Sequence, residues 1–182
     1  KTRDKSESVE IIKVAKERIT CFIAGDSPLV FNKMSEKAKR DLLMPGRRKT
    51  RVERDLTLKH NPVDEYRNSV YALSDPAAPT ALAIRSTAFK RALGSAALDM
   101  PGMKKTQIGR LTFVDGEFVG IYGVPKLFMT GVVMAGISRA PDIRTRAIVP
   151  EWACELSLSY VKPLITRQAV VNLLASAGIT IG

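Results

Sequence analysis

The sequence predicts a mixed α+β fold: a ferredoxin-like or RRM-like antiparallel sheet with two main helices on one face and a basic excursion inserted into it. Two observations support this prediction. Segments of strand length that are apolar or alternate with polar residues occur at 19–24 and 154–160, and apolar positions with helical spacing occur at 87–99 and 167–177. A hydrophobic content of 45% is enough to build a core. We expect residues 19–182 to form one domain and the charged residues 1–18 to form a leader.

The first part of the chain predicts one strand, the excursion and a loop. Residues 19–24 are β-branched and apolar and end at a Gly-Asp pair, which is typical of a buried strand. A short extended piece over 29–34 follows, and Ser35 can cap a helix that stops before Pro45. The segment 60–80 contains three prolines, so we expect a loop with one helical turn at 64–69.

The middle of the chain predicts a helix and a hairpin. Ser86 is placed to cap a helix over 87–99 that Pro101 and Gly102 end. The dipeptide Asp115-Gly116 favours a type I′ turn, which predicts a β-hairpin over 108–122. One face of that hairpin would carry Leu111, Phe113, Phe118 and Tyr122. These aromatic rings could stack nucleic-acid bases, but we favour the interpretation that they are core residues beneath a helix.

The last part of the chain predicts two strands, a helix and the start of a third strand. Residues 143–149 form the first strand, and alternation at 154–160 indicates a half-buried second one. Trp152 is interpreted as an anchor between them. Thr166 is placed to cap the helix, Gly178 stands where a C′ glycine belongs, and 179–182 would begin a strand.

Charge is the strongest functional signal in the sequence. The chain has 29 Lys and Arg against 18 Asp and Glu, a net charge of +11. Ten of these cations and only four of the carboxylates lie between Lys33 and Lys59, so the basic insertion at about 33–59 carries more than half of the excess. Such a cluster can contact a phosphate backbone or form a solvated loop, and the sequence leaves both interpretations open.

The candidate nucleic-acid-binding residues are the cations of this insertion together with three smaller groups. The insertion contributes Lys37, Lys39, Arg40, Arg47, Arg48, Lys49, Arg51, Arg54 and Lys59. The other groups are Lys90 with Arg91, Arg139 in a loop, and Arg144 with Arg146, which would share one face of a strand.

The sequence offers little for catalysis or cofactor binding. His60 is the single histidine and is interpreted as an ordinary surface residue, and two distant cysteines, Cys21 and Cys154, give neither a zinc motif nor a disulfide framework. We therefore expect no catalytic residue, no metal and no small-molecule cofactor. A metal-dependent nuclease using Asp64 or Glu65 stays open as an alternative. No uninterrupted apolar run of membrane-spanning length occurs, and the free cysteines indicate a reducing cytoplasm.

Several motifs resemble known families. FNKMSEKAKRDLL, KHNPVDEYR, AFKRA, IYGVP, DIRTRAIVPEW and AVVNLLASAG are similar to segments of a family of small proteins encoded by phages and prophages. Members of that family continue with a Gly-rich, Trp-containing tail, whereas this sequence ends at Gly182. The resemblance implies a phage protein in the cytoplasm of a bacterial host.

The layout also resembles, more remotely, the RAMP superfamily, the RRM-like backbone subunits of CRISPR effector complexes. That resemblance implies assembly along a nucleic-acid strand, as a homo-oligomer or as a subunit of a nucleoprotein complex. It places Lys90 and Arg91 near a phosphate backbone and the tip from Arg47 to Arg51 as a clamp.

These observations predict a nucleic-acid-binding protein that is not an enzyme and that binds single-stranded DNA or RNA through the phosphate backbone. The alternative is a structural or interaction protein, either an assembly subunit or an inhibitor of a host defence complex, with no nucleic-acid binding of its own.

Overall fold

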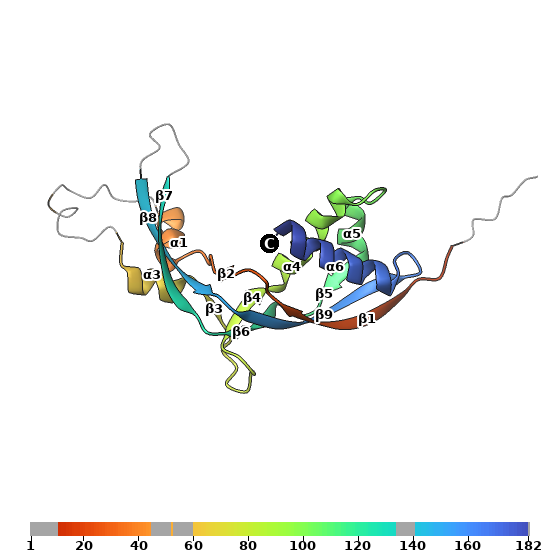
Figure 1. The fold of residues 1–182 in the computed structure, drawn as a ribbon, viewed down its shortest axis with the longest axis horizontal. Helices are drawn as coiled ribbons and strands as arrows, with labels where there is room; N and C mark the ends of the chain where they lie inside the picture. Colours follow the sequence, from red (N-terminus) through yellow and green to blue (C-terminus); the bar gives the residue numbers. More distant parts are fainter. Residues whose placement is uncertain (1–10, 45–51, 53–59, 134–140, 182) are drawn as a thin grey trace, which may run out of the picture.

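The computed structural model describes residues 11–44, 52, 60–133 and 141–181, and the fold is mixed α+β, as expected (Figure 1). Its strands pair antiparallel in two sheets, and the described residues contain five α-helices. The sheets follow one another along the long axis of the molecule (Figure 1). Among the described residues, no helix is both long and apolar enough to cross a membrane.

The first sheet is built around β9. Its strands follow the order β1 (Ala15–Ala24), β9 (Trp152–Lys162), β6 (Phe118–Gly123), β4 (Leu82–Arg85) and β3 (Tyr71–Ala72). The strands expected at 19–24 and 154–160 are confirmed; β1 begins earlier than expected and ends where expected, and β9 is longer at both ends. β3 and β4 were not predicted. This strand order does not confirm the finer ferredoxin-like or RRM-like arrangement.

The predicted hairpin at 108–122 is wrong. Its first half begins as helix α5 (Lys105–Leu111), and β5 (Thr112–Val114) then pairs with β9, as β6 does, so β5 and β6 follow one another along the same strand. Between them Asp115 donates its N–H to the Ser157 carbonyl at 2.9 Å, and Gly116 has a φ of +74°. Gly116 adopts the left-handed conformation that glycine favours, but β9 pairs with both segments, and the chain bends between them at residues 116–117.

Three helices cover one face of this sheet (Figure 1). They are α4 (Ser86–Ala96), continued by a 3₁₀ turn (Ala97–Asp99), α5, and α6 (Arg167–Ile181). The core lies between them and the sheet, and Leu93 of α4, Leu173 of α6 and Leu156 of β9 are fully buried in it. Burying such side chains stabilises the fold by about 1.5–3 kcal/mol each.

Several predicted helix ends differ from the structure. Ser86 lies inside α4, and Arg85 is the N-cap residue without a side-chain hydrogen bond. Gly178 does not end α6, which continues to Ile181 in place of the expected strand. Thr166 does cap α6, since its hydroxyl accepts the N–H of Ala169 at 3.2 Å.

The second sheet has the order β2 (Leu29–Val30), β8 (Pro141–Val149) and β7 (Lys126–Val133). β8 confirms the strand expected at 143–149, whereas β7 was not predicted. Helices α1 (Glu36–Leu43) and α3 (Pro62–Asn68) belong to this part (Figure 1). Ser35 caps α1 as expected, its hydroxyl accepting the Ala38 N–H. α3 confirms helix where one helical turn was expected at 64–69 within the loop 60–80, and it begins earlier, at Pro62.

A bent ribbon joins the two sheets. β6 continues into β7 and β8 into β9, and the bend lies at Gly123, whose φ is +148°. Trp152 pairs with Gly123 and donates its indole N–H to the Ser27 carbonyl at 2.9 Å. The ring lies so close to Gly25 that a Cβ there would fall 2.0 Å from the indole nitrogen. Trp152 is therefore the anchor that the sequence indicated.

Glu17 joins the ends of β1 and β9. Its carboxylate accepts hydrogen bonds from the Tyr160 hydroxyl at 2.6 Å and from Lys162 Nζ at 2.8 Å. The hydrogen bond from Lys162, followed by that from Tyr160, lowers the pKa of Glu17 below its ordinary value of 4.5. Since the folded state holds the lower pKa, this carboxylate stabilises the fold above pH 4.5, and that contribution disappears as the pH falls through the folded pKa.

The variant Glu17→Gln is therefore expected to be less stable than the original protein at neutral pH, with a difference that narrows on acidification. Urea unfolding midpoints at neutral pH and below the ordinary Glu pKa measure this. Glu155→Gln, at an exposed carboxylate of the same sheet, is the control. A difference that stays constant with pH would contradict the assigned role of Glu17.

Candidate nucleic-acid interface

Half of the predicted cations lie outside the described residues. They are Arg47, Arg48, Lys49, Arg51, Arg54, Lys59 and Arg139. Lys37 lies on α1, but its side chain is likewise outside the description. The predicted clamp at the tip of the insertion therefore stays a prediction.

Four of the described candidates lie on α1 or on the second sheet. Two of them lie beside a carboxylate and a third is half-buried. Lys39 donates to Glu36 at 2.7 Å within α1, where Arg40 is exposed. Arg144 lies 3.7 Å from Asp142, and Arg146 is half-buried opposite Phe128. Arg144 and Arg146 do share a face of β8, as expected.

Lys90 and Arg91 differ from these four cations because both lie on α4, beside residues of the first sheet. Lys90 Nζ lies 5.1 Å from the centroid of the Phe113 ring. Arg91 points elsewhere and lines a pocket with Arg85. Among the described residues, these two cations therefore point to the first sheet as the candidate binding surface.

The face of the first sheet that α4, α5 and α6 leave uncovered is called the open face. Along β9, residues 154, 156, 158 and 160 are buried, so the residues between them point the other way. Directly opposed residues of neighbouring strands share a face, and the register therefore assigns the rest. The open face carries Lys16, Arg18, Thr20, Phe22, Tyr71, Arg85, Phe113, Phe118, Tyr122, Glu155, Ser157 and Ser159.

Two aromatic residues of the open face are exposed to solvent. Phe22 on β1 has 83% of its surface accessible, and Tyr122 on β6 has 40%. They flank β9, since Phe22 pairs with Glu155 and Tyr122 with Ala153. Phe22 is thus a large apolar side chain exposed near the end of a ten-residue strand, on the same face as the ring of Tyr122.

Phe113 and Phe118 are half-buried on the same face and do not belong to the core. The favoured core interpretation of Phe113, Phe118 and Tyr122 is therefore wrong, and the reason is the missing hairpin. Because β5 and β6 both pair with β9, the register places these three side chains opposite residues of the open face, while Val119 and Ile121 face the helices.

Cationic groups lie over two aromatic rings of the open face, those of Phe113 and Tyr71. Lys16 Nζ lies 4.3 Å from the Phe113 centroid, on a ring that Lys90 also approaches. The Tyr71 ring has Arg85 Cζ at 5.3 Å and Lys33 Nζ at 5.5 Å, and lies 5.7 Å from the Phe118 ring. Each such contact contributes about 0.5–1 kcal/mol when exposed and holds the positive charge above an aromatic surface.

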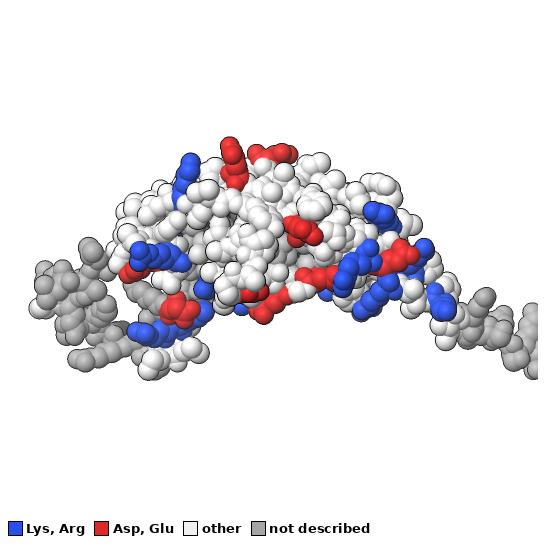
Figure 2. Space-filling model, turned by 90° about the horizontal axis from the view of Figure 1, so that it is seen from below, with Lys and Arg blue, Asp and Glu red and all other residues white. Residues whose placement is uncertain are grey.

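Carboxylates limit the positive charge of the open face. Arg18 Nε lies 2.8 Å from Asp115 Oδ2, and the other oxygen of Asp115 accepts the Ser159 hydroxyl at 3.2 Å. Figure 2 views the molecule from this side: blue Lys and Arg side chains gather toward the β1 end with red Asp and Glu side chains between them. Lys16 and Arg85 are exposed, and neither forms an ion pair with any described residue.

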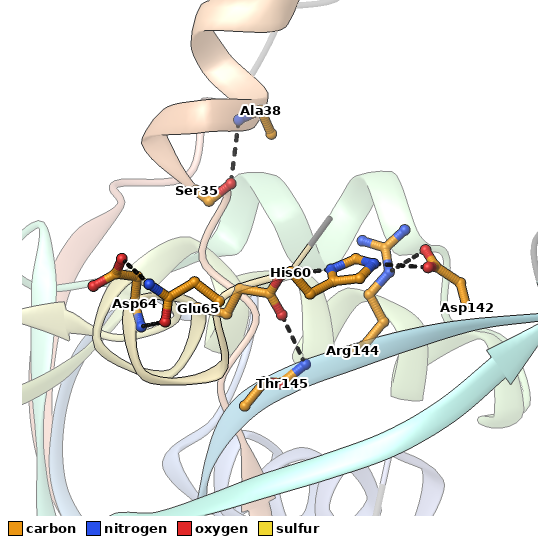
Figure 3. A network of polar contacts seen from close by, with 9 residues as sticks. Ser35, Ala38, His60, Asp64, Glu65, Asp142, Arg144 and Thr145 are labelled. Atoms are coloured by element: carbon orange, nitrogen blue, oxygen red, sulfur yellow. Dashed lines mark hydrogen bonds and ion pairs between the residues drawn. The ribbon is translucent and has the colours of Figure 1, made fainter. Parts of the chain in front are cut away.

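His60 belongs to a separate polar cluster on the second sheet (Figure 3). Its Nδ1 lies 2.6 Å from Glu65 Oε1 and its Nε2 lies 2.8 Å from Asp142 Oδ1. The second oxygen of Glu65 accepts the Thr145 N–H at 3.2 Å. His60 is therefore not the ordinary surface residue expected, because it ties the start of α3 to the edge of β8.

Asp64 and Glu65, the carboxylates of the nuclease alternative, have structural contacts. Asp64 accepts the side-chain N–H of Asn61 at 2.6 Å, and Glu65 satisfies an edge N–H of β8. Nowhere in the described ranges do three or more His, Cys, Asp or Glu residues form a group suited to a metal ion. Cys21 and Cys154 are free thiols, and burial raises the pKa of Cys154 to about 11.

Sequence reasoning missed the centre of the open face. Lys16, Arg18 and Phe22 alternate with the inward residues of β1, but 19–24 was interpreted as one continuous buried run. From residue 15 onward, the alternation of polar and apolar residues along β1 indicates a strand with one exposed face. Comparison with known proteins adds no assignment: no family model matches the chain, and the search of curated proteins finds no match.

Proposed function

We propose that this protein binds single-stranded nucleic acid on the open face of its first sheet. One observation carries the proposal: exposed aromatic rings and cationic side chains lie together on a sheet face that none of the described helices covers. Phe22 and Tyr122 offer ring faces to unpaired bases, and Lys16, Lys90 and Arg85 offer charge to phosphates. Both kinds of group are what sequence-tolerant single-strand binding requires.

The aromatic residues favour a single strand over a duplex. Bases in a duplex are stacked on one another and cannot reach a flat protein surface, whereas unpaired bases stack on aromatic side chains. A sheet with one helix-covered face and one bare face is also how RRM-like sheets bind RNA, so the finer RRM-like description belongs to this proposal. Binding needs no catalytic group, and we assign none.

Salt dependence tests the phosphate part of the proposal. Each phosphate contact to a single strand contributes roughly −0.7 to the slope of log K against log salt. The double variant Lys16→Gln with Lys90→Gln is expected to reduce the steepness by roughly 1.4, because both cations flank Phe113. Calorimetric titration of an unlabelled oligonucleotide over a salt series measures the slope.

The matched control is Lys104→Gln with Lys105→Gln, which removes the same charge from exposed positions at the start of α5, on the helix side. Those substitutions should leave the slope nearly unchanged. If the original protein binds with no salt dependence, or if both double variants lose the same slope, the open face is not the phosphate-binding surface.

A second candidate function is protein interaction through the ribbon of β7 and β8. The register places four partly exposed apolar side chains on one face of it: Leu127, Met129, Val133 and Ile143. Exposed apolar patches of this kind often mark protein interfaces. Under this candidate the protein would be an assembly subunit, a homo-oligomer or an inhibitor of a host defence complex. A phage origin and a cytoplasmic location are part of both proposed functions.

Size-exclusion chromatography with and without an oligonucleotide distinguishes the two functions. Oligomers that form equally well without the oligonucleotide and never retain nucleic acid favour protein interaction through the ribbon.

A further inference from the structure

A pocket of about 320 Å³ opens at the border of the first sheet. Its walls come from four places in the chain: the end of β2 with the residues after it, β3, the end of β4, and the first turns of α4. Together these contribute Val30, Phe31, Asn32, Tyr71, Ile84, Arg85, Thr87, Ala88 and Arg91. The volume lies at the lower end of the range for small-molecule sites, so the pocket can hold one small group but not a folded segment.

The lining combines apolar walls with cations, and none of the described residues that form it is a carboxylate. Val30 and Ile84 supply apolar surface, and Arg85 and Arg91 supply two guanidinium groups. Neither guanidinium forms an ion pair with any residue that the structure describes. Lys33 adds a third positive charge, since its Nζ lies over the Tyr71 ring that Arg85 also covers.

This lining suits a doubly charged anion whose molecule also carries a planar ring nearby. A phosphate at the end of a nucleic-acid chain is a monoester and carries about −1.5 to −2 charges at neutral pH, whereas each phosphate within the chain carries only one. Guanidinium groups bind phosphate oxygens through paired, charge-assisted hydrogen bonds. Tyr71 lies beside them with an aromatic surface for the adjoining base.

The position of the pocket also suits a chain end. β3 is the last strand of the sheet on this side, and Tyr71 belongs to it. A strand that lies across the open face from Phe22 toward Tyr71 therefore reaches the pocket where the sheet ends, and the segment 30–32 forms a wall there.

We infer that this pocket binds the terminal phosphate and the last nucleotide of a single-stranded nucleic acid. Arg85 and Arg91 hold the phosphate and Tyr71 contacts the base. The inference rests on the proposed function, because it adds an end-binding subsite to the open face.

The test compares three versions of one unlabelled oligonucleotide: hydroxyl groups at both ends, a 5′-phosphate, and a 3′-phosphate. Calorimetry is expected to give about tenfold tighter binding for one phosphorylated end, since hydrogen bonds to charged groups are the strong ones. Arg91→Gln is expected to abolish this advantage while leaving the affinity for the hydroxyl-ended strand within about twofold of the original. Arg91 is exposed and forms no described ion pair, so the variant should fold.

Arg110→Gln, at an exposed arginine of α5 outside the pocket, is the control and should keep the advantage. Equal affinity for all three oligonucleotides would overturn the inference and leave the proposed function standing. Loss of affinity for all three in Arg91→Gln would also overturn it, because the arginine would then contact the strand away from its end. Absence of binding to any of them would overturn the proposed function itself.

Discussion

Replacing Phe22 and Tyr122 together by alanine is expected to lower the affinity for a single-stranded oligonucleotide by roughly thirtyfold or more. Stacking of a base on an aromatic side chain contributes about 1–3 kcal/mol, and the two rings lie on different strands, so each can hold its own base. Both rings are exposed, and their removal should change the free energy of unfolding by less than about 0.5 kcal/mol each. Calorimetric or filter-binding titration measures the loss.

Phe128→Ala is the matched control for this experiment. Phe128 is an aromatic residue of similar exposure to Tyr122, but it lies on β7 in the second sheet. Its replacement should leave affinity for the oligonucleotide unchanged. If the control loses as much affinity as the double variant, or if the double variant binds like the original protein, the bases do not stack on the open face.

Replacing Gly123 by alanine should destabilise the fold by about 2–4 kcal/mol. The residue has a φ of +148°, and a Cβ built on it falls 2.4 Å from Val149 Cγ1 and 2.6 Å from the Glu151 carbonyl oxygen. The backbone strain and the clash with a backbone atom add together, because neither neighbour can move without opening the bend of the ribbon. Urea unfolding followed by circular dichroism measures the change.

Gly131→Ala provides the comparison on the same ribbon. A Cβ at Gly131 meets no atom within 4 Å, so its addition should shift the free energy of unfolding by less than about 0.5 kcal/mol. Equal stability of the Gly123 and Gly131 variants would show that the ribbon tolerates a side chain at the bend, contrary to the geometry described above.

The sequence predicts the elements whose local pattern agrees with their environment. β9 alternates from Cys154 to Tyr160 and is buried on one face there, so period and packing indicate the same strand. α6 has an apolar stripe and a capping threonine, and both are confirmed. The hairpin at Asp115-Gly116 failed because the dipeptide specifies only a local backbone conformation. Pairing with β9, a strand distant in the sequence (Val114 pairs with Leu158), decides what that conformation becomes.

The candidate site was predictable only in part. Charge led to Lys90 and Arg91, which do lie beside an aromatic ring and a pocket. The contact of Arg85 with Tyr71 depends on the pairing of β3 with β4, two short strands in a segment rich in proline that gave no strand signal. The highest density of positive charge predicted a phosphate clamp in the insertion, whose tip lies outside the described residues.

Trp152 is the only tryptophan of the chain, and it lies at the bend where Gly123 pairs with it. Its indole packs against Gly25 and is hydrogen-bonded to Ser27. Fluorescence excited at the red edge of protein absorption therefore originates from this one ring. The emission wavelength reports whether the segment after β1 stays packed against Trp152 of β9. The next residue of β9, Ala153, pairs with Tyr122 of the open face. The protein thus carries an intrinsic optical probe beside the surface proposed to bind nucleic acid.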